Sequence, residues 1–127
     1  MLHVPVMVKQ VVDAFRLCPV GDFVDGTLGT GGHAEALLKV YPEATLLGID
    51  LDVDGLKLAR ERLFRFGERA VLSQGSYTEM ASLVRREEVG PIVGILLDLG
   101  TSSSVSYTHL RAHETLRYLV CRLLLEK

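Results

Sequence analysis

Short apolar runs alternate with longer amphipathic segments over the first hundred residues of the chain. Apolar residues at helical spacing predict helices over 6–15, 33–40, 53–66 and 78–88. The short apolar runs predict strands over 23–25, 45–50, 70–73 and 92–97. Strands that alternate with helices in this way are typical of βαβ units, so the pattern predicts an α/β fold, a Rossmann-like parallel sheet of four strands.

Residues 105–127 carry a second signal besides the leucines that fit an amphipathic helix. Codons of a transposase adapter used in sequencing libraries translate as residues 105–115, and those of the flow-cell adapter that follows it translate as residues 119–127. These agreements share one reading frame. We therefore expect residues 1–104 to be a partial domain, truncated after about its fourth strand, and residues 105–127 to be a non-native tail.

Composition excludes several classes of protein. The hydrophobic fraction of 48% and the charged fraction of 24% are ordinary for a globular protein, and no apolar run has the length of a membrane span. The start of the chain lacks the apolar core of a secretory signal, so we expect a cytoplasmic protein without a membrane partner. Residues 1–104 hold ten basic and fourteen acidic residues, a net charge of −4, which argues against a nucleic-acid surface within them. No cysteine or histidine cluster has metal-ligand spacing, so no metal is expected.

A glycine-rich segment, DGTLGTGGH at 25–33, follows the first expected strand and precedes a helix. Ligands of parallel α/β sheets bind at the carboxyl ends of the strands, glycines let the backbone approach a ligand closely, and a helix N-terminus offers free N–H groups. The alternative is a turn that only reverses the chain. His33, in the first turn of the helix, is better explained as a wall of a ligand pocket than as a base.

Three more side chains are expected at the same edge. Asp50 ends the second strand, where a carboxylate can accept hydrogen bonds from ribose hydroxyls, whereas Asp52 and Asp54 fit helix N-capping. Asp98 ends the fourth strand and fits either the capping of a turn or a catalytic role. Tyr77 follows the third strand, where its ring can pack in the core or lie against an adenine.

The glycine segment alone fits two cofactors. Gly29, Gly31 and Ala34 match the fingerprint of dinucleotide-binding proteins, so a fragment of an NAD-dependent oxidoreductase stays open. Asp25, however, is expected at the mouth of the loop, where it would repel a pyrophosphate. A carboxylate there suits the ammonium and sulfonium groups of S-adenosylmethionine, so the residues favour a methyl donor.

Four segments together point to one family. They are HVPV at 3–6, VDGTLGTGGH at 24–33, GIDLD at 48–52 and GILLDLGTSS at 94–103. Together they resemble the bacterial 16S ribosomal RNA cytosine-N4 methyltransferases, the RsmH or MraW family, over residues 3–103. The resemblance implies a class I methyltransferase fold, S-adenosylmethionine as cofactor, and 16S ribosomal RNA of the small subunit as partner.

The resemblance also assigns roles to six residues. It implies cofactor contacts for Gly31, Gly32, His33, Asp50, Tyr77 and Asp98. Asp50 would hold the ribose, and Asp98 would in addition be the catalytic candidate, near the N4 amine of a cytidine that attacks the methyl group. Tyr77 stands where the family often has Phe, and the Pro-Gln pair that usually follows the two serines is absent. A fragment of this kind is expected to be inactive alone, and a donor-binding module without activity is the alternative function.

Overall fold

The computed structural model describes residues 8–98. Within them, helix α1 (Val8–Phe15) precedes a sheet of four strands. The strands are β1 (Asp22–Asp25), β2 (Leu46–Asp50), β3 (Ala70–Gln74) and β4 (Ile92–Leu96). The connecting elements are α2 (Gly32–Val40), α3 (Val53–Arg62), the 3-10 helices η1 (Phe64–Arg69) and η2 (Tyr77–Glu79), and α4 (Met80–Glu87). The segments at 3–6 and 105–127, on which two of the sequence interpretations rest, lie outside the described residues.

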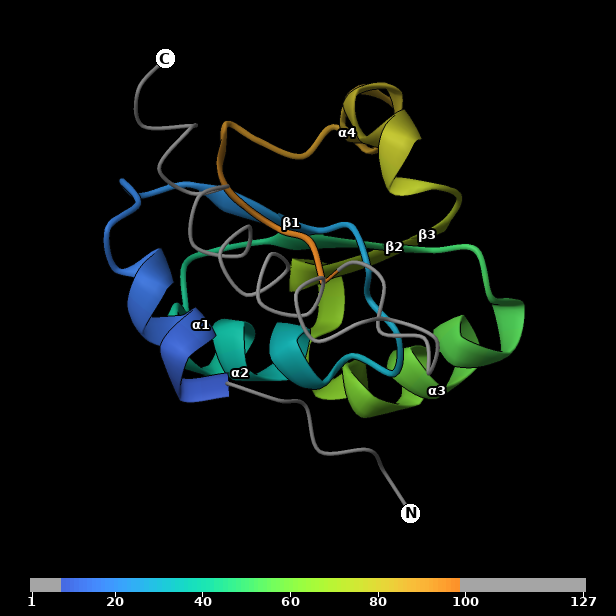
Figure 1. The fold of residues 1–127 in the computed structure, drawn as a ribbon, viewed down its shortest axis with the longest axis horizontal. Helices are drawn as coiled ribbons and strands as arrows, with labels where there is room; N and C mark the ends of the chain where they lie inside the picture. The colour runs from blue at the N-terminus through green and yellow to red at the C-terminus, as the bar shows by residue number, and fades with distance from the viewer. Residues whose placement is uncertain (1–7, 99–127) are drawn as a thin grey trace, which may run out of the picture.

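The sheet has the order β3-β2-β1-β4, and all of its strand pairs are parallel. Helices α1, α2 and α3 cover one face, and α4 covers the other (Figure 1). The chain crosses from the β3 edge to the far side of β1 through α4. The described connections that leave β1 and β3 therefore run over opposite faces and place β2 and β4 on opposite sides of β1, which makes the carboxyl edge between β1 and β4 a topological switch point. The predicted α/β Rossmann-like parallel sheet is confirmed.

The core explains why the strands read as apolar runs. In β2, Leu46 packs in the cluster under α1, α2 and α3, whereas the adjacent Leu47 packs in the cluster under α4. Both leucines are fully buried. Successive side chains of a strand point to opposite faces, so a strand covered on both sides must be apolar throughout.

Two predicted helices differ from the structure in their ends. The helix expected over 53–66 ends at Arg62 and continues as the 3-10 helix η1, in which Gly67 adopts a φ of 58° that no α-helix accommodates. The helix expected over 78–88 opens with the 3-10 turn η2. There the Ser76 side chain accepts the Thr78 N–H while Glu79 accepts the Ser76 N–H, a reciprocal capping box.

The amino edge of the sheet is held by one carboxylate. Asp22 of β1 accepts the Thr45 N–H, 2.9 Å from nitrogen to oxygen, and the Gly90 N–H at 3.0 Å. Thr45 directly precedes β2, and Gly90 lies two residues before β4. Asp22 therefore fixes where β2 and β4 begin relative to β1. No helix within 8–98 is long and apolar enough to cross a membrane.

Candidate functional site

A pocket of about 250 Å³ lies at the carboxyl edge, where all four strands end. Each strand end contributes to its lining: Gly26 and Thr27 after β1, Asp50 and Leu51 at the end of β2, Gly75, Ser76 and Tyr77 after β3, and Asp98 after β4. The pocket therefore sits at the switch point, where open α/β sheets bind their ligands.

Backbone hydrogen bonds orient the carboxylate of Asp50 in the pocket. Its Oδ2 accepts the Gly29 N–H at 2.7 Å, and its Oδ1 accepts the Asp52 N–H at 2.9 Å. A carboxylate has about four acceptor positions, so each oxygen can accept one further hydrogen bond. The two backbone bonds fix the carboxylate in advance, with both oxygens able to receive a pair of neighbouring hydroxyls.

The segment after β2 folds locally around its acidic residues. Asp52 caps α3, because its Oδ1 accepts the Asp54 N–H at 3.0 Å. The capping prediction is thus confirmed for Asp52, whereas Asp54 lies in the first turn and supplies the N–H. The Asp50 carbonyl accepts the Gly75 N–H at 3.0 Å, which ties the exit of β3 to the exit of β2.

Glycines of the loop after β1 permit close contacts on both of its sides. A Cβ at Gly26 would lie 2.5 Å from Leu97 Cδ2 and 2.9 Å from Tyr77 Cβ, so only glycine fits between the exits of β3 and β4. Gly31 has a φ of 88°, which is strained for any residue with a Cβ, and it faces Ala59 of α3 and Leu63 directly after α3. The loop is therefore built from glycine for packing as well as for approach to a ligand.

The structure brings three of the six predicted cofactor residues together. Asp50, Tyr77 and Asp98 line the pocket. The other three are not among its lining residues: they are Gly31, Gly32 and His33, at the start of α2. The His33 side chain is buried. Their contacts with a donor stay predictions, as does the catalytic role of Asp98.

Sequence reasoning missed the role of Thr27. Its Oγ1 accepts the Asp98 N–H at 2.7 Å, and its own N–H donates to Asp25 Oδ1 at 3.1 Å. Thr27 thereby joins the exit of β1 to the exit of β4 inside the pocket. Its place in the glycine segment was a visible signal, but nothing local indicated its partner 71 positions away.

The sequence interpretation of Asp25 was wrong in one respect. Its side chain is 1% exposed and does not line the pocket, because its carboxylate turns under the loop to the Thr27 N–H. Among residues 8–98, the carboxylates that line the pocket are those of Asp50 and Asp98, and no Lys or Arg lines it. The electrostatic preference for a cationic ligand over a pyrophosphate therefore stands on these two residues.

The lining fits S-adenosylmethionine by its chemistry. Asp50 offers acceptors for ribose hydroxyls, the half-exposed Tyr77 ring offers an apolar surface for a base, and the two carboxylates suit an ammonium and a sulfonium. No cluster of three or more potential metal ligands occurs in the part of the chain that the structure describes.

The fold is the Rossmann-like α/β fold, which solved methyltransferase structures share. One solved structure that shares the fold is a candidate rRNA methylase from Clostridium thermocellum, with a TM-score of 0.64 and 18% identity over 93% of this chain and 64% of that one. Another is an rRNA methylase from Streptococcus thermophilus, with a TM-score of 0.58 and 20% identity over 94% of this chain and 65% of that one.

The family follows from sequence. The model of the MraW methylase family matches residues 1–114, and the chain belongs to this family. The ribosomal RNA small subunit methyltransferase H of Trichlorobacter lovleyi is 43% identical over 102 residues, and that of Streptomyces avermitilis is 44% identical over 104. Each alignment covers 80% of this chain and 33% of the relative, so the chain spans about one third of their length. The family resemblance is confirmed, and S-adenosylmethionine is the methyl donor of this family.

Proposed function

We propose that this chain is the donor-binding part of an S-adenosylmethionine-dependent methyltransferase that acts on the N4 amine of a cytidine in 16S ribosomal RNA. The observation that supports this most directly is the Asp50 carboxylate, held by two backbone N–H groups in a pocket formed by all four strand ends. Membership of the MraW methylase family and the names of the curated relatives support the RNA substrate. A ribosomal RNA substrate also favours a cytoplasmic location.

In this proposal the residues of the pocket bind and orient. Asp50 accepts hydrogen bonds from the ribose hydroxyls, the Tyr77 ring borders the adenine, and Gly31 and Gly32 bring the backbone close to the methionine end. S-adenosylmethionine, when bound, supplies an electrophilic methyl group. Catalysis then rests on positioning the cytidine amine in line with that group, and Asp98 accepts a hydrogen bond from the amine as its proton becomes acidic.

Acceptor recognition is assigned to parts of the relatives that this chain does not span. A base in a folded RNA must be unstacked before its exocyclic amine can enter such a pocket, which requires an extended basic surface. Residues 1–104 have a net charge of −4 and offer no such surface as a whole. We therefore propose that the chain binds the donor but does not transfer the methyl group by itself.

A transfer assay tests this division. The chain is incubated with labelled S-adenosylmethionine and small-subunit RNA, beside the full-length methyltransferase H of Trichlorobacter lovleyi as positive control. We expect labelled RNA only with the full-length relative. Labelled RNA with this chain would show that a third of the relatives' length suffices, and would overturn the proposed inactivity.

A calorimetric titration separates the methyl donor from a dinucleotide. We expect S-adenosylmethionine to bind, and NAD to bind at least about tenfold more weakly because its pyrophosphate meets two carboxylates and, among the described lining residues, no cation. Tight NAD binding without S-adenosylmethionine binding would favour the oxidoreductase fragment instead.

A further inference from the structure

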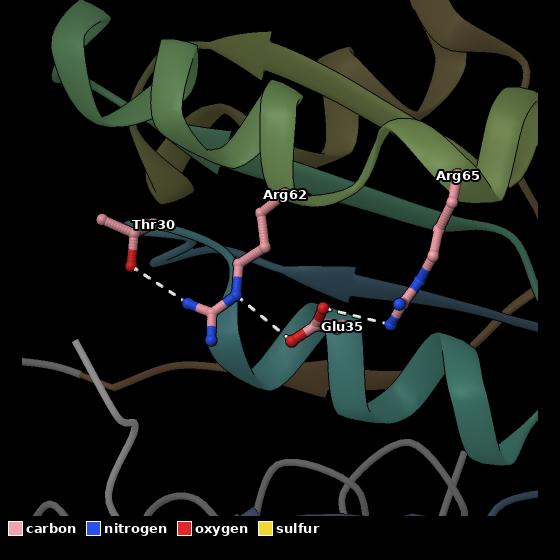
Figure 2. A network of polar contacts seen from close by, with 4 residues as sticks. All are labelled: Thr30, Glu35, Arg62 and Arg65. Atoms are coloured by element: carbon pink, nitrogen blue, oxygen red, sulfur yellow. Dashed lines mark hydrogen bonds and ion pairs between the residues drawn. The ribbon is translucent and has the colours of Figure 1, made fainter. Parts of the chain in front are cut away.

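Arg62, the last residue of α3, is a mostly buried cation beneath the glycine loop. Its side chain is 12% exposed, and its Nε donates to Glu35 Oε1 of α2 at 3.2 Å. Its Nη1 donates to Thr30 Oγ1 of the loop at 3.5 Å (Figure 2). A guanidinium withdrawn from water needs such partners, and its planar fork can serve two of them at once.

Arg65 provides a natural contrast within the same network. Its Nη2 donates to the other Glu35 oxygen at 3.1 Å, but its side chain is 53% exposed and the contacts drawn for it do not reach the loop (Figure 2). Both arginines therefore neutralise the same carboxylate, and only Arg62 also holds Thr30.

The loop rests along one face of α3. Gly55 and Ala59 are four residues apart, which places them on the same side of α3, and Leu63 follows as the residue directly after the helix. A Cβ at Gly55 would lie 3.6 Å from the Gly29 carbonyl oxygen, and a Cβ at Gly31 would lie 3.4 Å from Ala59 Cβ and from Leu63 Cδ1. Arg62 adds a polar contact to this apolar support.

The supported residues are those that orient the pocket carboxylate. Gly29 donates its N–H to Asp50 Oδ2, and it precedes Thr30 in the chain. Gly29 and Gly31 both have positive φ, which glycine adopts readily because it has no Cβ. Glycine also has more accessible conformations than other residues, so this part of the loop loses more entropy when it is fixed. A contact that fixes Thr30 in the free protein lowers the cost of ordering the loop around a ligand.

From these contacts we infer that Arg62 is a positioning residue for donor binding, which holds the loop through Thr30 while Glu35 holds Arg62. The inference rests on the proposed function and goes one step further, because it assigns a role in donor affinity to a side chain that does not line the pocket. Arg65 then contributes to the ion pair but not to donor affinity.

The test compares Arg62→Gln with Arg65→Gln in the full chain, by calorimetric titration with S-adenosylmethionine and by urea unfolding. Both variants lose an ion pair to Glu35. We expect Arg62→Gln to raise the Kd for S-adenosylmethionine about five- to tenfold, and Arg65→Gln to change it by less than about twofold. Equal affinities in the two variants would overturn the inference, even if Arg62→Gln is the less stable protein.

Thr30→Val keeps the test decisive if Arg62→Gln fails to fold. The substitution preserves the shape of the side chain, leaves the ion pair in place and removes only the acceptor. We expect about a two- to threefold higher Kd with an unchanged unfolding midpoint, and an unchanged Kd would refute the role of the contact. If the unsubstituted chain binds no S-adenosylmethionine, the proposed function fails and this inference with it, whereas binding that is insensitive to both substitutions removes the inference alone.

Discussion

The two edges of the sheet carry cavities of similar size and opposite chemistry. At the amino edge, about 320 Å³ is lined largely by apolar and aromatic groups, among them Phe15, Phe23 and Tyr41. Phe15 and Phe23 meet edge to face with ring centroids 4.9 Å apart, and the Tyr41 hydroxyl donates to the Val12 carbonyl at 2.6 Å. At the carboxyl edge, about 250 Å³ is lined by two carboxylates, small residues and one ring.

The two edges differ in how hydrogen bonds orient their polar groups and in the acceptor positions that remain. Near the amino edge Arg69 donates to the carbonyls of Leu38, Tyr41 and Ala44, and Asp22 accepts two backbone N–H groups. The carboxylate in the lining of that cavity is the exposed Glu43. At the carboxyl edge Asp50 is oriented by backbone bonds yet keeps an acceptor position on each oxygen. The volume of a cavity therefore does not distinguish the two edges, whereas a carboxylate that backbone hydrogen bonds hold in place, with acceptor positions left, lies in the lining at the carboxyl edge.

Truncation of Phe15 should affect stability more than any other change considered for either edge. Its ring is 1% exposed in the main core cluster, so Phe15→Ala should lower the free energy of unfolding by about 3–5 kcal/mol. Urea unfolding measures this change, with Leu58→Ala, at a half-exposed position of α3, as the matched control that should cost less than about 1 kcal/mol. Similar losses in the two variants would mean that the amino edge is not part of the folding core.

Replacement of the Thr27 hydroxyl should, by contrast, change the affinity for S-adenosylmethionine and leave stability nearly unchanged. Thr27→Val keeps the shape but removes the acceptor for the Asp98 N–H, so we expect the Kd for S-adenosylmethionine to rise about three- to tenfold, with less than about 1 kcal/mol lost from stability. Titration calorimetry measures the Kd, and Thr27→Ser, which retains the hydroxyl, should restore it. A Thr27→Val variant with an unchanged Kd would show that the link between β1 and β4 does not shape the pocket.

The smallest effect is expected from the titration of Tyr41. Burial raises the pKa of its phenol above the ordinary value; Arg16 lowers the pKa and Asp13 raises it as lesser influences. The unfolded phenol then loses its proton at a lower pH than the folded one. The protonated phenol of Tyr41 therefore contributes fully to the free energy of unfolding below about pH 10, and this contribution is lost as the pH rises towards the pKa of Tyr41 in the folded protein. Urea unfolding between pH 8 and 11 should show a decline that Tyr41→Phe lacks, and parallel curves would contradict it.

The sequence was sufficient for the features that follow from local patterns. Asp50 was predictable because it ends an apolar run of strand length beyond a glycine loop, and both properties are visible in a short window. The end of α3 was not, since the apolar spacing continues through Leu63 and Phe66 while the backbone changes to a 3-10 helix after Arg62. The burial of Asp25 and its bond to the Thr27 N–H depend on how the loop folds over the strand end.

Contacts between distant segments were beyond the sequence for the same reason. The bond from the Asp98 N–H to Thr27, and the bridge from Arg62 to Thr30 and Glu35, join residues that become neighbours only when the sheet and its helices are assembled. Residue type alone does not indicate whether an arginine at the end of a helix is exposed or buried. The family resemblance added roles for single residues but not these supporting contacts.

The central claim is that the carboxyl edge binds S-adenosylmethionine through Asp50, and a paired titration tests it most directly. The unsubstituted chain, Asp50→Asn and Asp54→Asn are each titrated with S-adenosylmethionine. Both substitutions remove one negative charge and lie four residues apart, but of the two only Asp50 lines the pocket. We predict that Asp50→Asn raises the Kd about tenfold or more, as expected for the loss of hydrogen bonds to a charged acceptor, while Asp54→Asn changes it by less than about twofold. Equal affinities in the two variants would contradict the account.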